Sequence, residues 1–401
     1  MRNSAIVLAS VLFVSSAPSL AQTTLPPDSA DWIVLGEQPT GTFGQFSPAG
    51  DVDGDGYDDV AIGDADYDGA FINSGRVTFH RGSPTGLSAA PDWILEGNAA
   101  QARLSLASPA ADVNGDGFDD VIVGGRLHLG TPAGPVPTSW TLTGGSPKAG
   151  DVNADGFADL AVFATVTDVH VFHGSPAGLP ATPSAVLTVA VGADGGLVQA
   201  AFEDVNGDGY DDYVLSWLTE LDGSQFFQDY DVTLFFGSAG GLGKRKSLFK
   251  GSETLVYAVS AGDVDDDGLG DLVLSLSGDV LENLYWRARG RTSGVSPQSA
   301  QLALAHTTPH ALGDFNGDGF DDVVVPFITG GWALSVHPGG PAGLSTTAVF
   351  RVEPVNIAFV SLAAAGDVNG DGLGDLIARD SVNTGGGNAP RVFVFHGRPT
   401  P

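Results

Sequence analysis

The sequence contains no cysteine, so disulfide bonds, thiolate-bound metal sites and a cysteine nucleophile are all excluded. Basic residues are also scarce, because 17 lysines and arginines stand against 48 aspartates and glutamates, giving a formal net charge of −31. Binding to nucleic acid or to an anionic membrane surface needs clustered positive charge, so we expect neither as a partner. Beyond the N-terminus no stretch approaches the roughly 20 consecutive apolar residues of a membrane-spanning helix, so we expect no membrane span.

Glycine and proline are abundant, with 57 and 24 residues, and hydrophobic residues make up 42% of the chain. This composition favours a turn-rich β protein with a large core over a disordered chain.

The first 21 residues have the three parts of a secretory signal. Arg2 is followed by an apolar run over residues 5–14 and by small residues at 19–21. We predict a signal peptide over 1–21, cleaved after Ala21, and a single domain over 22–401. A buried N-terminal strand or helix is the alternative interpretation of the apolar run. We expect the mature protein to be soluble and exported, either secreted, periplasmic or associated with the cell surface.

One nine-residue pattern occurs seven times, and its first copy reads Asp-Val-Asp-Gly-Asp-Gly-Tyr-Asp-Asp. The copies lie at 51–59, 112–120, 151–159, 204–212, 263–271, 314–322 and 367–375. Their start-to-start spacings are 61, 39, 53, 59, 51 and 53 residues. A short apolar run rich in β-branched residues follows each copy, and a second pattern ending in a Gly-Ser-Pro type of turn lies further on. Both features are typical of short strands joined by turns.

Each unit predicts an inner strand, the acidic loop, two further strands and an outer strand. Seven units of four strands predict an all-β, seven-bladed β-propeller. The last unit lacks its outer strand, whereas residues 31–35 nearly repeat the outer strand of the first unit at 92–96. We therefore predict that residues 31–35 complete the last blade and close the ring, which removes an unpaired sheet edge.

The acidic loop offers side-chain oxygens at positions 1, 3, 5 and 9 and a backbone carbonyl at position 7. A hard divalent cation requires oxygen ligands of this kind, and the glycine present at position 6 of all seven loops allows a tight turn around it. Position 12 is apolar in every copy, which excludes the helix-loop-helix calcium hand. We predict up to seven Ca²⁺ ions. Polar turns without metal are the alternative.

The predicted ligands at position 1 are Asp51, Asp112, Asp151, Asp204, Asp263, Asp314 and Asp367. Those at position 3 are Asp53, Asn114, Asn153, Asn206, Asp265, Asn316 and Asn369. Those at position 5 are Asp55, Asp116, Asp155, Asp208, Asp267, Asp318 and Asp371. The predicted carbonyl ligands at position 7 belong to Tyr57, Phe118, Phe157, Tyr210, Leu269, Phe320 and Leu373. Those at position 9 are Asp59, Asp120, Asp159, Asp212, Asp271, Asp322 and Asp375.

The segment 43–63 runs from Phe-Gly-Gln-Phe-Ser-Pro-Ala-Gly into the first acidic loop, and it resembles the FG-GAP repeat of integrin α propellers. Because all seven loops keep the ligand pattern, the chain is most similar to the secreted bacterial type of this family. The Phe-Gly half is clear only in this first repeat. The resemblance implies a seven-bladed propeller used for adhesion or recognition, with calcium on the face opposite the partner-binding loops. Nothing in the chain resembles the other integrin domains.

The predicted strand order leaves two sets of loops of variable length on the face opposite the acidic loops. Large aromatic residues fall there, and exposed aromatics on loops are typical of protein or sugar recognition. We select Tyr67, Trp217, Trp286 and Trp332 as candidate ligand-binding residues. The equal alternative is that these side chains cap the core.

The sequence contains no nucleophile elbow, no zinc-protease motif and no phosphate-binding loop, so we expect a protein that is not an enzyme. Our first hypothesis is a monomeric, calcium-binding adhesion or recognition module for an extracellular protein or glycan. A secreted polysaccharide hydrolase or lyase that uses a pair of carboxylates is the alternative from another class. An inert accessory scaffold is a third.

Overall fold

The computed structural model describes residues 23–38, 42–189, 196–221, 228–251, 255–277, 284–289, 296–303, 309–328, 332–353, 361–383 and 388–399. The predicted signal peptide lies outside the described residues. Apart from a short 3-10 turn at Pro27–Ser29, the regular structure of the described segments consists of β-strands. No helix in these segments is long and apolar enough to cross a membrane.

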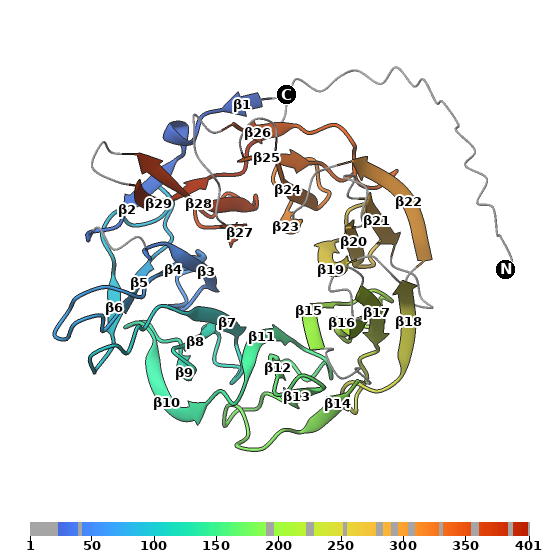
Figure 1. Ribbon diagram of the computed structural model, residues 1–401, viewed down its shortest axis with the longest axis horizontal. Coiled ribbons are helices and arrows are strands. Elements are labelled where there is room, and N and C mark those ends of the chain that lie inside the picture. The colour runs from blue at the N-terminus through green and yellow to red at the C-terminus, as the bar shows by residue number, and fades with distance from the viewer. Residues whose placement is uncertain are drawn as a thin grey trace, which may run out of the picture.

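The strands form radially arranged sheets around a central axis (Figure 1). The first sheet contains β3 (Gln45–Gly50), β4 (Asp59–Asp64), β5 (Arg76–His80) and β6 (Trp93–Glu96). The second contains β7 (Ala107–Ala111), β8 (Asp120–Val123), β9 (Arg126–Leu129) and β10 (Val136–Thr141). The third contains β11 (Gly145–Gly150), β12 (Asp159–Phe163), β13 (Asp168–Phe172) and β14 (Ala185–Thr188). The fourth contains β15 (Gly196–Glu203), β16 (Asp212–Leu221), β17 (Gln228–Phe235) and β18 (Arg245–Gly251).

The fifth sheet contains β19 (Leu255–Gly262), β20 (Asp271–Ser277), β21 (Leu284–Arg289) and β22 (Ser296–Ala303). The sixth has five strands, β23 (His310–Gly313), β24 (Asp322–Ile328), β25 (Trp332–His337), β26 (Phe350–Val352) and β1 (Thr23–Leu25). The last contains β27 (Ser361–Gly366), β28 (Asp375–Asn383), β29 (Asn388–Phe395) and β2 (Trp32–Leu35). An all-β propeller with four-stranded blades, as predicted, therefore describes the architecture.

The two ends of the chain meet in the last sheet. Strand β2 pairs antiparallel with β29, with Trp32 opposite Val394 and Leu35 opposite Arg391, which confirms the predicted closing strand. Upstream of it, β1 pairs in parallel with β26 and adds the fifth strand of the sixth sheet. No repeat pattern in the sequence predicts this second attachment of the N-terminal segment.

The core lies between the faces of neighbouring sheets. Where the first and last sheets meet, Val60 and Ile62 of β4 pack in one buried cluster with Val392 and Val394 of β29 and with Trp32. The apolar run after each acidic loop forms the second strand of its sheet, and burying these runs drives the sheets together. The predicted strand positions after the loops are confirmed.

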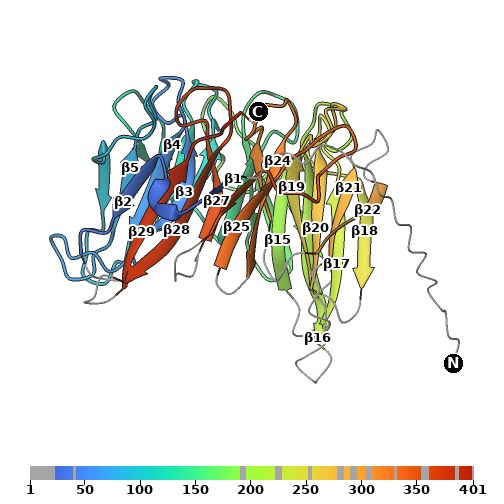
Figure 2. The ribbon, with the colours of Figure 1, turned by 90° about the horizontal axis from the view of Figure 1, so that it is seen from above.

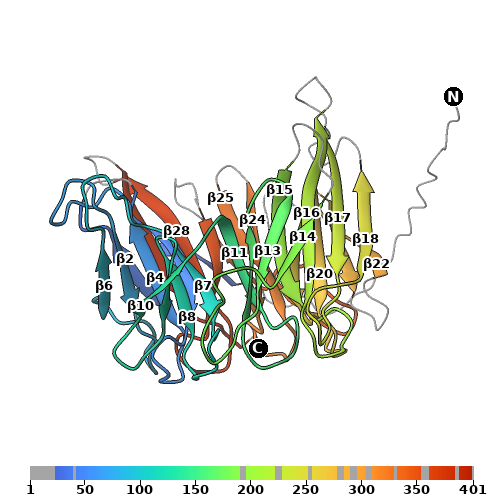
Figure 3. The same cartoon turned by 90° about the horizontal axis from the view of Figure 1, so that it is seen from below.

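Sheet height varies around the ring. Strand β16 has ten residues whereas β8 has four, and the second unit also has the shortest repeat spacing, 39 residues. In Figures 2 and 3 the end of β16 extends beyond the neighbouring sheets on the side away from the acidic loops. Length variation is therefore concentrated at one end of the propeller.

Candidate metal centres

The acidic loops connect the innermost strand of each sheet to the second strand, as predicted. In the first sheet, β3 ends at Gly50, the loop spans 51–59, and β4 begins at Asp59. The glycine at position 6 has a positive φ between 76° and 91° in all seven loops, a conformation that other residues rarely adopt. Position 4 is also left-handed throughout, and there Ala154 and Asp266 both adopt a φ of 53°. One turn geometry is thus shared by all seven loops.

The carboxylate at position 1 is fixed by the backbone of its own loop. Asp51 Oδ1 accepts hydrogen bonds from the N–H groups of Gly54 at 2.7 Å and Asp55 at 3.0 Å, and its Oδ2 accepts one from Gly56 at 2.8 Å. The bond from position 6 to position 1 recurs in every loop at 2.7–2.9 Å. The loop is thereby folded around its first carboxylate.

The carboxylate at position 9 is fully buried in all seven loops. Asp59 accepts hydrogen bonds from the N–H of Val52 at 3.1 Å and from the N–H of Gly82, after the third strand, at 2.9 Å. The glycine of the second sequence pattern thus donates to the acidic loop. Burial raises the pKa of Asp59 and of Asp322 to about 8, because an ionised carboxylate is poorly solvated there. A nearby cation would favour the ionised form.

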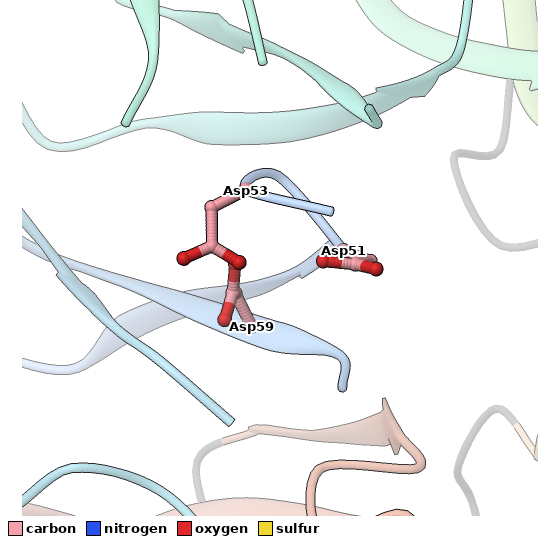
Figure 4. Close-up of side chains that lie close together, drawn as sticks. All are labelled: Asp51, Asp53 and Asp59. Atoms are coloured by element: carbon pink, nitrogen blue, oxygen red, sulfur yellow. The ribbon is translucent and has the colours of Figure 1, made fainter. Parts of the chain in front are cut away.

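In two of the loops the structure brings three predicted ligands together in a compact group. Carboxylate oxygens of Asp51, Asp53 and Asp59 lie within 4.8 Å of one another (Figure 4), and Asp263, Asp265 and Asp267 form a similar group. In the loop at 314–322, the Oδ1 atom of Asn316 is buried and has no hydrogen-bond partner among the described residues. Clustered carboxylates and an orphaned buried oxygen acceptor at position 3 fit a hard cation.

Arg81 is a site residue that sequence reasoning missed. Its guanidinium forms an ion pair with Asp53 through Nε and with Asp55 through Nη2, the latter at 2.7 Å. It stands directly before the glycine that donates to Asp59, and two other sheets have His173 and His396 at the same place. The sequence signal for this ion pair was the arginine that directly precedes this glycine in the first unit. The loop at 51–59 therefore carries an internal cation.

Hydrogen bonds join the seven loops into a closed ring. The N–H of position 8 in each loop donates to the carbonyl of position 1 in the preceding loop, at 2.9–3.3 Å in all seven cases. The bond from Asp58 to Asp367 joins the first loop to the last. The geometry of one loop consequently depends on that of its neighbours.

At four junctions a side chain strengthens this contact. The aspartate at position 8 accepts a hydrogen bond from the N–H of position 1 in the preceding loop, as Asp119 does from Asp51 at 3.0 Å. The other three are Asp58, Asp211 and Asp321. In each case a glycine precedes position 1, and a side chain on Gly50 would overlap the Asp119 carboxylate. We call this combination of glycine and aspartate the interloop clasp.

The remaining three junctions lack the clasp. Position 8 is Ala158, Gly270 or Gly374 there, and the residue before the preceding loop is Ala111, Glu203 or Gly313. Glu203 lies against Gly270 and accepts a hydrogen bond from the hydroxyl of Ser260. Burial raises the pKa of Glu203 to about 7. The clasp pairs residues between 58 and 309 positions apart in sequence, and no local pattern predicted it.

The candidate ligand-binding aromatics do not form a common exposed surface among the described residues. The ring of Tyr67 is partly buried and lies 3.8 Å from the guanidinium carbon of Arg76. Trp217 is only 5% exposed and packs on β16 in the core between the third and fourth sheets, which matches the alternative of core packing. Trp286 and Trp332 lie on strands β21 and β25, and their side chains are outside the described part of the structure.

No protein-family model matches the chain. A stretch of 84 residues is 39% identical to integrin alpha-V of Gallus gallus, covering 20% of this chain and 8% of that protein. A stretch of 98 residues is 33% identical to integrin alpha-5 of Xenopus laevis, covering 23% of this chain and 9% of that protein. The matched stretches thus span less than a tenth of the length of these curated relatives.

A solved structure of BBS1N in complex with ARL6DN, soaked with lead, superposes with a TM-score of 0.51. It covers 93% of this chain and 99% of that chain at 10% sequence identity, which shows the fold alone. Together, the propeller fold and the integrin-like stretches confirm the resemblance to the N-terminal propeller of integrin α chains.

Proposed function

We propose that this chain is a calcium-stabilised recognition module that acts outside the cell, without catalytic activity. In this proposal the acidic loops hold Ca²⁺ and the opposite end of the propeller binds a protein or glycan. The observation that carries the calcium assignment is the recurrence, in all seven loops, of a fully buried carboxylate at position 9 next to an amide-bound carboxylate at position 1.

We also propose that the ring has seven blades. The five-stranded sheet is then the sixth blade, widened at its edge by β1, and each blade carries one acidic loop. The closed circuit of seven hydrogen bonds between loops supports this count.

The side-chain oxygens at positions 1, 3, 5 and 9 and the carbonyl at position 7 would hold the ion, which supplies positive charge to a group of buried acids. The chain's own residues prepare the site. The amides of Gly54, Asp55 and Gly56 orient the first carboxylate, and the amides of Val52 and Gly82 orient the ninth. Because buried carboxylates are costly without a counter-charge, binding of the cation is coupled to folding.

The recognition role is supported by the integrin-like stretches and by the absence of a catalytic motif from the sequence. Loops that vary in length on a repeated scaffold are the usual location of binding residues. The predicted signal peptide is the reason for placing this activity outside the cell.

A combined metal and ligand experiment tests the proposal. The chain from residue 22 onward is dialysed against chelator, then titrated with calcium while bound metal and melting temperature are followed. The same protein is applied to arrays of extracellular proteins and glycans in millimolar calcium and in chelator. Calcium uptake with a raised melting temperature and calcium-dependent binding support the proposal. An unchanged melt without calcium uptake rejects the calcium role, and hydrolysis of an arrayed polysaccharide rejects the non-enzymatic role.

A further inference from the structure

A cleft opens between the first and second sheets, at the end of the propeller away from the acidic loops. Its volume is about 490 Å³, within the range of ligand-binding pockets. Its lining includes Leu95, Leu104, Leu106, Val123, Arg126 and Pro137.

The cleft follows from the shortest repeat of the sequence. Strand β8 ends at Val123, and the chain turns back at once through Gly124 and Gly125, whose φ angles are 57° and 80°. The second sheet therefore stops early, while the neighbouring connection at 97–106 continues beside it. A spacing of only 39 residues leaves nothing in this unit to fill the space.

The connection at 97–106, which lines this cleft, is held in place by the connection between β4 and β5. The N–H groups of Gln101, Arg103 and Leu104 donate to the carbonyls of Ile72, Asn73 and Ser74 at 3.0–3.1 Å. Asn73, Gln101 and Arg103 adopt positive φ angles of 47°, 61° and 51°. Outside the acidic loops and the residues that adjoin them, the described chain has no other non-glycine residue in this conformation. Such strain persists where the surroundings impose a specific shape, and it often accompanies binding sites.

The charge in the cleft is unusual for this protein. Arg126 is exposed, and within the described part of the chain its guanidinium forms no ion pair, although the formal net charge is −31. Arg103 also lines the cleft but is paired with Asp66. The carboxylate of Glu96, the one acid of the lining, lies against Gly69. Arg126 is therefore available to a carboxylate from outside, which a guanidinium binds through paired hydrogen bonds.

The rest of the lining favours a peptide over a sugar. Its apolar side chains are aliphatic, Leu106 is 65% exposed, and no phenyl or indole ring is among the lining residues. Sugar recognition commonly uses stacking on aromatic rings, whereas aliphatic side chains of a peptide pack well against leucine, valine and proline. Phe71 and Ile72, 47% and 67% exposed, extend the apolar surface along the adjoining connection.

We propose that this cleft binds an acidic segment of a partner protein, with a carboxylate on Arg126 and a neighbouring aliphatic side chain against Leu104 and Leu106. This inference rests on the recognition function proposed above and assigns it a place and a ligand chemistry.

The probe is the fluorescein-labelled peptide Leu-Asp-Leu-Glu-Leu, compared with its amide counterpart Leu-Asn-Leu-Gln-Leu by fluorescence polarisation in millimolar calcium. We expect the acidic peptide to bind more tightly, and Arg126→Gln to weaken it by about tenfold or more, as for loss of a charge-assisted contact. Leu106→Asn should weaken both peptides. Arg245→Gln, which removes another exposed arginine, on β18, is the matched control and should change nothing.

Equal affinity for the two peptides, or acidic binding that survives Arg126→Gln, overturns the proposal. Arg126-dependent binding of an oligoglucuronate in place of the peptide overturns it in favour of a glycan. If an arrayed ligand binds the chain equally with and without Arg126→Gln, the recognition function stands and only this cleft is rejected. Since Arg126 and Leu106 are both exposed, neither change should disturb folding.

Discussion

The two ends of this propeller differ in how strictly they repeat. At the acidic-loop end, seven loops share one backbone geometry and are hydrogen-bonded in a closed ring. At the other end, second strands range from four to ten residues, and one short unit leaves a cleft. Shared geometry at one end indicates a common structural task, for which we propose cation binding. Variation at the other end leaves room for a specific ligand without disturbing that task.

Removal of calcium tests the acidic-loop end most directly, and we expect it to have the largest effect on stability. Each proposed site adds about 1.4 kcal/mol when free calcium is ten times its dissociation constant, so several sites together approach the stability of an ordinary domain. The melting temperature in excess chelator should fall well below that in millimolar calcium. Magnesium at the same concentration is the control. Coincident melts in calcium and chelator would show that the loops are stable polar turns.

Two substitutions in one loop separate its framework from its metal ligands. Asp59→Ala leaves the buried amide of Gly82 without an acceptor and removes one of the two acceptors of the Val52 amide, so it should cost about 1–3 kcal/mol even in chelator. Asp55→Ala removes a partly exposed acid and should cost much less in chelator. Urea denaturation in chelator and in millimolar calcium measures the loss of unfolding free energy for each variant. Equal losses for the two variants in chelator would contradict the framework role of position 9.

The interloop clasp can be tested by removing it from one junction and introducing it at another that lacks it. Asp119→Ala leaves the N–H of Asp51 without its carboxylate acceptor and should cost about 1–2 kcal/mol. Conversely, Ala158→Asp should be tolerated better together with Ala111→Gly, because a side chain before the loop occupies the place of the clasp. Urea denaturation of the two single variants and the double variant measures this coupling. Additive effects of the pair would reject the clasp as a unit.

Repetition explains which features the sequence could predict. The loop hairpins, the turn glycine and the closing strand at residues 31–35 could each be identified because another copy shows the same local pattern. Features that occur once had no such support. The parallel pairing of Thr23–Leu25 with β26 depends on a three-residue segment without periodicity. Trp217 was selected as a loop aromatic, but the ten-residue β16 carries it into the core.

Contacts between units could not be predicted either, because they join residues from different copies of the repeat or distant parts of one copy. The clasp needs Gly50 and Asp119 to be compared across two copies, and the ion pair of Arg81 needs the end of the third strand to be placed beside its loop. The spacing of 39 residues was visible, but the cleft depends on what the neighbouring unit places beside it.

The stability of the calcium-free protein and its affinity for calcium should change in opposite directions with pH. Burial raises the pKa of Asp59 and Asp322 to about 8, whereas in the unfolded chain these groups ionise near the usual value of 3.8. Between these values the folded state binds more protons than the unfolded state, so stability in chelator falls as pH rises through this window. Calcium binding needs the ionised groups, so its affinity rises with pH over the same interval.

Melting curves at about pH 6 and about pH 8, in chelator and in calcium, measure both trends. In chelator the melting temperature should be higher at the lower pH, and calcium should reduce or reverse that difference. A melting temperature in chelator that rises from the lower to the higher pH would contradict the assignment.

Loop 51–59 should differ from its six counterparts, since Arg81 already lies between Asp53 and Asp55. An incoming cation must displace this guanidinium, and we expect the first loop to be the weakest site. Arg81→Ala should raise the affinity of that loop by severalfold while lowering stability in chelator, because the buried carboxylate of Asp53 then loses its counter-charge. Tyr57 occupies position 7 of this loop, and its ring also lies against Gly370 of the last loop. Terbium luminescence sensitised by Tyr57 therefore follows the first loop when Tyr210→Phe is combined with Asp371→Ala, which removes a proposed ligand of the last loop. If terbium affinity is unchanged or lower in Arg81→Ala, the guanidinium does not compete with the metal, and the first loop is equivalent to the others.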